Sequence, residues 1–357
     1  MADFDYGNAR IRAMKSRLLT QRELEALAEA GSLQGLISSL AKSVYHKSVE
    51  MALVRASGLE CIVQALHMDL IDTLGKAQNF YIDDARRMVA LALRPYDIHN
   101  IKTILRGLAR NVAPAEIVPA LLPVGELKYA VLTDLARAPG PRAAIDMLVS
   151  MNEPIAKPLI ELRLQRPGAE VHEMELALDQ WHYREAMDYL KSAPPAAEIL
   201  GEALKLDADI ENLLSMLRFV REPEERRHLQ ERLGGDLTDL LVTAGRLQPA
   251  QLVRLGNLDS IEAAVESLET TRFRPAIQTG MQAYKQTGRL SEFETHLKRF
   301  RLSWLSKLIY KDTLGIGVFL GYLALKINEI NNLRWITHGI NLGLNAGDIK
   351  AELEFAA

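Results

Sequence analysis

The chain has 357 residues, of which 48% are hydrophobic and 25% are charged, and its formal net charge is -3 at pH 7. This composition excludes a disordered chain, the length predicts two or three domains, and the slight acidity argues against nucleic acid as a partner. The single cysteine, Cys61, excludes an internal disulfide and is expected to be a small buried hydrophobic residue.

The first residues of the chain are charged throughout and lack the apolar core of a signal peptide. The most apolar stretch, residues 314–325, has 12 residues, whereas a helix that spans a bilayer needs about 20. We therefore expect no membrane span, so that any membrane connection depends on a partner.

Helical spacing of apolar residues runs along nearly the whole chain. In residues 59–70 and again in residues 88–96, the apolar positions lie three or four apart, which is typical of amphipathic helices. The alternation of β-branched residues that would indicate strands is absent. Proline and glycine clusters separate the expected helices at residues 113–114, 122–125, 139–141, 165–168, 194–195 and 234–235. The sequence predicts an all-α fold.

An acid, an asparagine three residues later and a base nine residues after the acid form a pattern that occurs three times. The second copy starts 112 residues after the first, and the third starts 120 residues after the second. The copies are Asp97, Asn100 and Arg106; Asp209, Asn212 and Arg218; and Glu329, Asn332 and His338. A glutamate precedes each copy by 34 to 37 residues, at Glu60, Glu175 and Glu294. These intervals predict three tandem, structurally similar domains: residues 1–112, 113–225 and 226–357.

The repeated residues are interpreted as structural positions. Asparagine is a poor helix former unless its side chain is used, and residues three or four apart share one face of a helix. We expect each asparagine to be buried and bonded to the backbone of an adjacent helix, with the acid paired to a neighbouring base. Such a network would fix how the helices cross, and a scaffold repeats it more readily than an enzyme repeats an active site.

Nucleotide-binding motifs fail in this sequence. The only Gly-Lys pair is Gly75-Lys76, and Leu70 stands where the first glycine of a phosphate-binding loop must be. Gly315, Gly317 and Gly321 approach a dinucleotide fingerprint, but the third glycine is one position late and no strand precedes it. Close packing of helices is the better interpretation of these glycines.

Metal-binding and catalytic motifs fail as well. His172-Glu173 suggests a zinc protease, but Leu176 replaces the second histidine. A calcium loop beginning at Asp207 fails because Asn212 replaces its turn glycine and Arg218 its last glutamate. Nothing resembles the G-x-S-x-G motif of serine hydrolases. We therefore predict no catalytic residue, no cofactor and no metal.

Basic and aromatic residues alternate in residues 296–311, which allows a nucleic-acid surface or a contact with an acidic partner. An amphipathic helix with a charged outer face is preferred, because the whole chain is slightly acidic.

Three passages of the chain resemble the C-subunit family of V/A-type ATPases, called the d-subunit family in eukaryotic V-ATPases. They are DYGNARIR at residues 5–12, YDIHNIKTILR at residues 96–106, and the stretch from GIG at residues 315–317 to EINNLR at residues 329–334. The closing passage is the most specific. The middle repeat departs most, since Lys205 stands where the other copies have Leu93 and Leu325.

The resemblance implies a pseudo-threefold funnel of three helical domains, located in the cytoplasm and attached to the membrane through a partner. In this family the funnel is a non-catalytic rotor component that joins the central shaft, made of the D and F proteins, to the membrane proteolipid ring. It transmits torque during proton or sodium transport and binds no nucleotide. The alternative is a different helical-repeat scaffold that binds another protein partner in a groove.

Overall fold

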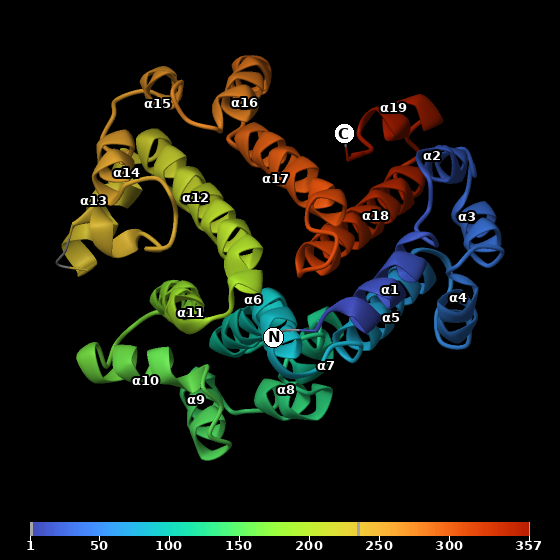
Figure 1. Cartoon of the computed structure of the whole chain (residues 1–357), viewed down its shortest axis with the longest axis horizontal. Helices are drawn as coiled ribbons and strands as arrows, with labels where there is room; N and C mark the ends of the chain where they lie inside the picture. Colours follow the sequence, from blue (N-terminus) through green and yellow to red (C-terminus); the bar gives the residue numbers. More distant parts are fainter. Residues whose placement is uncertain (1–2, 234–235, 357) are drawn as a thin grey trace. The chain divides into compact units, whose positions relative to one another are not determined.

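The computed structural model describes residues 3–233 and 236–356, and these residues form helices and loops without any strand (Figure 1). The predicted all-α class is confirmed. The expected break at residues 234–235 lies outside the described residues. Cys61 is buried in the helix Gly58–Gln78, as expected for a small hydrophobic residue.

A series of three shorter helices followed by two long helices occurs three times along the chain. The first series consists of α2 (Gln21–Ala28), α3 (Leu33–Leu40), α4 (His46–Leu53), α5 (Gly58–Gln78) and α6 (Asp83–Ala109). The second consists of α8 (Tyr129–Ala136), α9 (Pro141–Ser150), α10 (Ala156–Gln165), α11 (Val171–Ser192) and α12 (Glu198–Arg221). The third consists of α14 (Pro249–Gly256), α15 (Ile261–Ser267), α16 (Arg274–Thr287), α17 (Ser291–Lys311) and α18 (Gly317–Asn341).

The remaining elements stand before the first series or after a long helix. They are α1 (Asp5–Lys15), α7 (Pro114–Ile117), α13 (Pro223–Leu233), α19 (Ala346–Ala351) and the 3-10 turns Val118–Ala120, Pro195–Ala197 and Leu237–Leu240. Side-chain caps begin several of the short helices: Thr20 accepts from the N–H of Glu23, and Ser260 accepts from that of Ala263.

Two compact units divide the chain: Met1–Leu93 together with Leu302–Ala357, and Arg94–Arg301. We call them the terminal unit and the central unit. Both borders fall inside long helices, α6 and α17. The terminal unit therefore contains both ends of the chain. The predicted division into three domains remains a prediction.

In the terminal unit, α18 packs against α1, α2, α3 and α5. Sixteen of the residues of α18 are buried, so it is a core helix. A Cβ on Gly321 would lie 2.5 Å from a side-chain carbon of Ile309 and 2.9 Å from the carbonyl oxygen of Leu305, both in α17. The glycine therefore permits the close helix packing that the sequence suggested.

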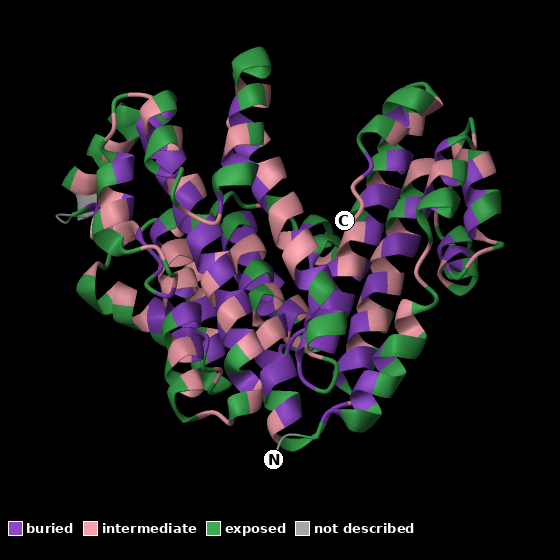
Figure 2. Ribbon diagram, turned by 45° about the horizontal axis from the view of Figure 1, so that its top comes forward, coloured by how far each residue is buried: buried purple, intermediate pink, exposed green. Residues whose placement is uncertain are grey.

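In the central unit, one apolar core joins the last turns of α6, from Ile98 to Leu108, to α8, α9, α10 and α11. This core extends across residue 112, where the first predicted domain border lies. A further set of contacts joins α12 to α14 and α15. The long helices show buried faces and exposed faces side by side (Figure 2), which is the pattern expected of amphipathic helices.

Candidate functional site

The repeated asparagines form the same pair of hydrogen bonds in the central unit. The side-chain amide of Asn100 donates to the carbonyl oxygen of Leu122 at 2.8 Å, and its oxygen accepts from the N–H of Leu122 at 2.7 Å. Asn212 forms the two equivalent bonds with Val242, at 2.9 and 3.0 Å. Both asparagines are buried. Each side-chain amide thus bonds both the backbone N–H and the backbone carbonyl of one residue in the segment that follows its helix.

The third copy repeats this geometry in the terminal unit. Asn332 donates to the carbonyl oxygen of Glu354 at 2.7 Å and accepts from its N–H at 3.0 Å. We call these three arrangements the asparagine clamps. In every copy the partner lies in an irregular segment after the long helix, not in an adjacent helix as the sequence had suggested. An irregular segment has free backbone groups, whereas those inside a helix are already bonded to one another.

The acids of the first two copies accept hydrogen bonds from backbone N–H groups in the same segments. Asp97 accepts from the N–H of Leu127 at 3.1 Å, and Asp209 accepts from that of Leu247 at 2.9 Å. Leu127 and Leu247 each stand five residues after the clamped residue and two residues before a short helix. Burial raises the pKa of Asp97 to about 6, although these N–H bonds oppose the shift. The acids therefore fix the backbone just before the next helix series begins.

A glycine makes room for each of these two aspartates. A Cβ on Gly125 would lie 2.3 Å from either carboxylate oxygen of Asp97, and a Cβ on Gly245 would lie 2.0 Å from Oδ1 of Asp209. In both segments the glycine stands two residues before the leucine that donates its N–H. The third copy has no glycine at that place, and its acid is the longer Glu329.

The acid of the third copy is bonded to the opposite end of the chain. Glu329 accepts from the N–H of Leu19, and the hydroxyl of Tyr45 donates to Glu329 Oε1 at 2.5 Å. Lys326 Nζ lies 2.9 Å from the same oxygen and 2.8 Å from Asp69 Oδ2. Burial raises the pKa of the Tyr45 hydroxyl well above its usual range, so this hydroxyl stays protonated and remains a donor. Leu19 thus takes the place that Leu127 and Leu247 hold in the other copies.

The predicted bases and upstream glutamates are less regular than the acids and asparagines. The structure brings one pair together: the guanidinium of Arg106 binds both carboxylate oxygens of Glu175. The other two glutamates bond locally, Glu60 with Gln64 at 3.0 Å and Glu294 with Lys298 at 2.5 Å. The remaining bases, Arg218 and His338, are exposed on α12 and α18.

Further ion pairs link the long helices within the central unit. Lys102 Nζ lies 2.5 Å from Asp179 Oδ1, which joins α6 to α11. The guanidinium of Arg301 binds Asp207 at 2.5 and 2.9 Å, which joins α17 to α12. Asp207 and Asp209, the first two acids of the rejected calcium loop, are therefore both bonded within the protein.

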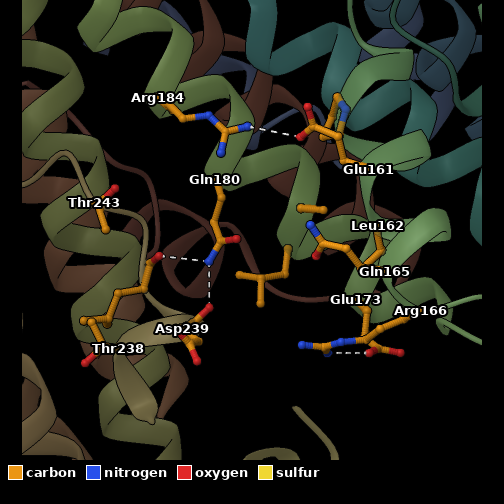
Figure 3. A pocket seen from close by; sticks show the side chains of 14 residues that line it. Glu161, Leu162, Gln165, Arg166, Glu173, Gln180, Arg184, Thr238, Asp239 and Thr243 are labelled. Carbon is orange, nitrogen blue, oxygen red and sulfur yellow. Dashed lines mark hydrogen bonds and ion pairs between the residues drawn. The ribbon is translucent and has the colours of Figure 1, made fainter. Parts of the chain in front are cut away.

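A groove in the central unit lies between α10, α11 and residues 238–243 (Figure 3). The side-chain amide of Gln180 donates to the carbonyl oxygens of Asp239 and Leu241, at 2.7 and 3.1 Å, and so holds this segment beside α11. Arg166 pairs with the buried Glu173 at 3.1 Å at one edge of the groove (Figure 3). The charges that line this edge are thus paired within the protein.

Among residues 3–233 and 236–356, no three histidine, cysteine or acidic side chains are arranged to hold a metal ion. Across the same residues, no helix is both long enough and apolar enough to cross a membrane.

Residues 7–352 match the family described as ATP synthase (C/AC39) subunit. The C subunit of the A-type ATP synthase of Methanosarcina acetivorans is 26% identical, over 99% of this chain and 93% of its own length. That of Methanocaldococcus jannaschii is 25% identical, over 99% of this chain and 86% of its own length. The C subunit of the V-type ATP synthase of Deinococcus radiodurans is 26% identical, over 99% of this chain and 91% of its own length.

Proposed function

Because the chain belongs to the family of the ATP synthase C/AC39 subunit, we propose that it is the rotor component that couples the central shaft of a rotary ATPase to its membrane ring. As a member of this family it is a structural subunit of an A/V-type ATP synthase rather than a catalytic one. In our proposal it receives the shaft, made of the D and F proteins, on one face and seats on the proteolipid ring with another. The transported ion is a proton or a sodium ion.

The observation that carries this proposal is the threefold recurrence of the asparagine clamp. A part that transmits torque must be stiff, and each clamp fixes an irregular segment with two hydrogen bonds in a buried place. The three copies support three similar domains, with borders near residues 112 and 225, arranged as a funnel with pseudo-threefold symmetry. Such a funnel offers a central axis to a rotating shaft.

The two proposed contacts differ in chemistry. The shaft would meet an apolar lining with a polar rim, as protein interfaces commonly have. The ring would meet a more polar surface, because short polar loops connect membrane helices on the aqueous side. The chain would then be cytoplasmic and attached to the membrane peripherally, through the ring. Raising the salt concentration should release the ring before the shaft, since salt screens exposed charges most.

The test is a pull-down of the tagged chain from its native membranes, with the bound proteins identified by mass spectrometry. Recovery of a proteolipid together with a coiled-coil shaft protein is the expected result. Recovery of a soluble partner without any ATPase component, from membranes known to hold the intact complex, would overturn the proposal in favour of a general helical-repeat scaffold.

A further inference from the structure

The outward face of α4, the helix His46–Leu53 of the terminal unit, exposes apolar side chains. Figure 1 shows where this helix lies. Val54 is 83% exposed, Met51 53%, Val44 50% and Leu53 46%. All four lie in or next to a helix of eight residues. So dense a set of exposed apolar residues is unusual for a surface that meets only water.

The exposed residues form an ordered stripe. Lys47, Met51 and Val54 follow one another at intervals of four and three residues, so they share one side of the helix, and Val44 lies in the turn just before it. The opposite side packs inward: Tyr45, Val49 and Ala52 are buried. The stripe is therefore the outermost part of this helix.

One cation, Lys47, belongs to the stripe and two more, Lys42 and Arg55, stand beside it in the sequence; all three are exposed. Within the part of the chain that the structure describes, none of the three forms an ion pair with a carboxylate. The single acid of α4, Glu50, lies 3.3 Å from His46. The face thus combines apolar side chains with positive charges that the protein itself leaves uncompensated.

The other two helix series serve as internal controls for this face. In α10, which holds the same place in the second series, Lys157 pairs with Glu185 at 3.6 Å and Arg163 with Asp146 at 2.6 Å. In α16, the outward positions include Thr279, Gln282 and Lys285. Each control helix shares only part of this pattern: α10 exposes the apolar Leu164 but pairs its cations Lys157 and Arg163, and α16 exposes Lys285 among polar residues. The combination of several exposed apolar residues with unpaired cations is therefore particular to α4.

We propose that the outward face of α4 binds the surface of a membrane that contains anionic lipids. A helix with apolar side chains flanked by lysine and arginine is typical of segments that lie in the interface of a bilayer. The unpaired cations complement the phosphate groups of anionic lipids, and the apolar side chains of the stripe reach the layer beneath the headgroups. This contact is separate from the coupling role proposed above, because it involves lipid and needs neither the shaft nor the ring.

The experiment is flotation of the purified full-length chain with two kinds of vesicle: phosphatidylcholine alone, and phosphatidylcholine mixed with phosphatidylglycerol. The chain should float with the mixed vesicles and not with the neutral ones. Lys47→Gln should weaken this binding about fivefold, and Val54→Ser should weaken it by up to roughly tenfold. Raising the salt concentration should weaken the binding of the wild-type chain.

The matched controls carry the same changes elsewhere. Lys285→Gln removes an exposed lysine of α16, and Leu164→Ser removes a leucine of α10 that is 77% exposed. Both should float like the wild type, and the thermal unfolding of all four variants should match that of the wild type. Equal binding to both kinds of vesicle, or equal loss in the controls, would overturn the proposal. So would absence of binding, or cross-linking of Lys47 to a carboxylate of a neighbouring protein in the assembled complex, which would assign the face to a protein contact.

Discussion

Asn100, Asn212 and Asn332 each use a whole side-chain amide to bond both polar groups of one residue in an irregular segment. An irregular segment at the end of a helix cannot satisfy its own backbone, so a buried one needs outside partners. An asparagine is well suited because it offers a donor and an acceptor side by side. At the residue scale, the clamp thus turns a loop into a fixed part of the core.

Replacing one clamp residue should show this directly. Asn212→Ala leaves the buried N–H and carbonyl of Val242 without their partner, which costs about 2 to 4 kcal/mol of unfolding free energy. Urea unfolding of the variant and the wild type measures the difference. Asn257→Ala is the control, because Asn257 is exposed at the end of α14 and its side chain bonds only locally to Val253. Equal losses in the two variants would contradict a special role for the clamp.

His182 is buried in the central unit, and neither of its ring nitrogens has a hydrogen-bond partner within the described residues. Burial, with help from Arg94 and Lys102, lowers the pKa of this histidine to about 3. An unfolded histidine titrates near 6.5, so below that pH the unfolded chain binds more protons than the folded one. The stabilising effect of keeping His182 neutral is therefore complete above pH 6.5 and declines as the pH falls toward 3.

This linkage predicts a specific pH dependence. Between pH 7.5 and pH 5, His182 should remove about 2 kcal/mol from the unfolding free energy. His182→Leu should lose less stability over this range than the wild type, by about that amount. Urea unfolding at the two pH values provides the comparison, and His228→Leu, at an exposed histidine of α13, is the control. If His182→Leu and the wild type showed identical pH dependence, protonation of His182 would not contribute to the pH dependence of the unfolding free energy.

At the scale of the elements, each acid bonds the backbone just before the start of a helix series, and this contact requires a close approach. In the central unit a glycine provides the space, whereas the terminal unit uses the longer Glu329. The hydrogen bond between the acid and the backbone before a helix series is therefore made in two ways: by an aspartate beside a glycine, or by the longer glutamate without a glycine.

Gly245→Ala should test the first solution. The new methyl group would meet the carboxylate of Asp209 at 2.0 Å, and the segment must shift away from the N–H bond of Leu247. We expect a loss of about 2 kcal/mol or more, as for other buried sites that are overpacked. Gly168→Ala is the matched control, since nothing lies within 4 Å of the added carbon. A melting temperature for Gly245→Ala equal to that of the control would refute the steric explanation.

Much of this element-level organisation could be predicted from the sequence. Helical periodicity and proline or glycine clusters identified the all-α fold, and the Asp97 and Asn100 spacing identified two residues that prove to be buried and bonded to backbone. The sequence did not predict the role of three leucines, Leu19, Leu127 and Leu247. Each contributes only its backbone N–H, which every residue except proline has, so the type of side chain does not indicate this role. The glycines at 125 and 245 were a usable signal, since both precede a leucine by two residues.

At the scale of the whole molecule, the contact of Glu329 with Leu19 joins residues that are 310 positions apart. Such a pairing cannot be found from local patterns, because nothing near either residue indicates the other. In the central unit the equivalent contacts join residues 30 and 38 positions apart. The third copy therefore uses the beginning of the chain in the place where the other two use the segment that follows their own helix.

This arrangement predicts slow hydrogen exchange at the amide of Leu19. Residues near a chain end usually exchange fast, but this N–H is bonded to a buried carboxylate. Its protection should approach that of the amides of Leu127 and Leu247. Exchange can be followed by NMR or by mass spectrometry of short peptides, and Glu329→Gln should speed exchange at Leu19 while leaving the other two unchanged. Fast exchange at Leu19 in the wild type would argue against a stable hydrogen bond between its N–H and Glu329.

The terminal unit is built from the first 93 and the last 56 residues of the chain. On a ribosome these two parts emerge at opposite times of synthesis. Tyr45 and Asp69 are made early, but the buried lysine and glutamate that they contact are made near the end. The central unit, whose residues are contiguous, can fold while translation continues. We therefore expect the central unit to complete its fold before the terminal unit, whose early residues lack their packing partners until the last helices are made.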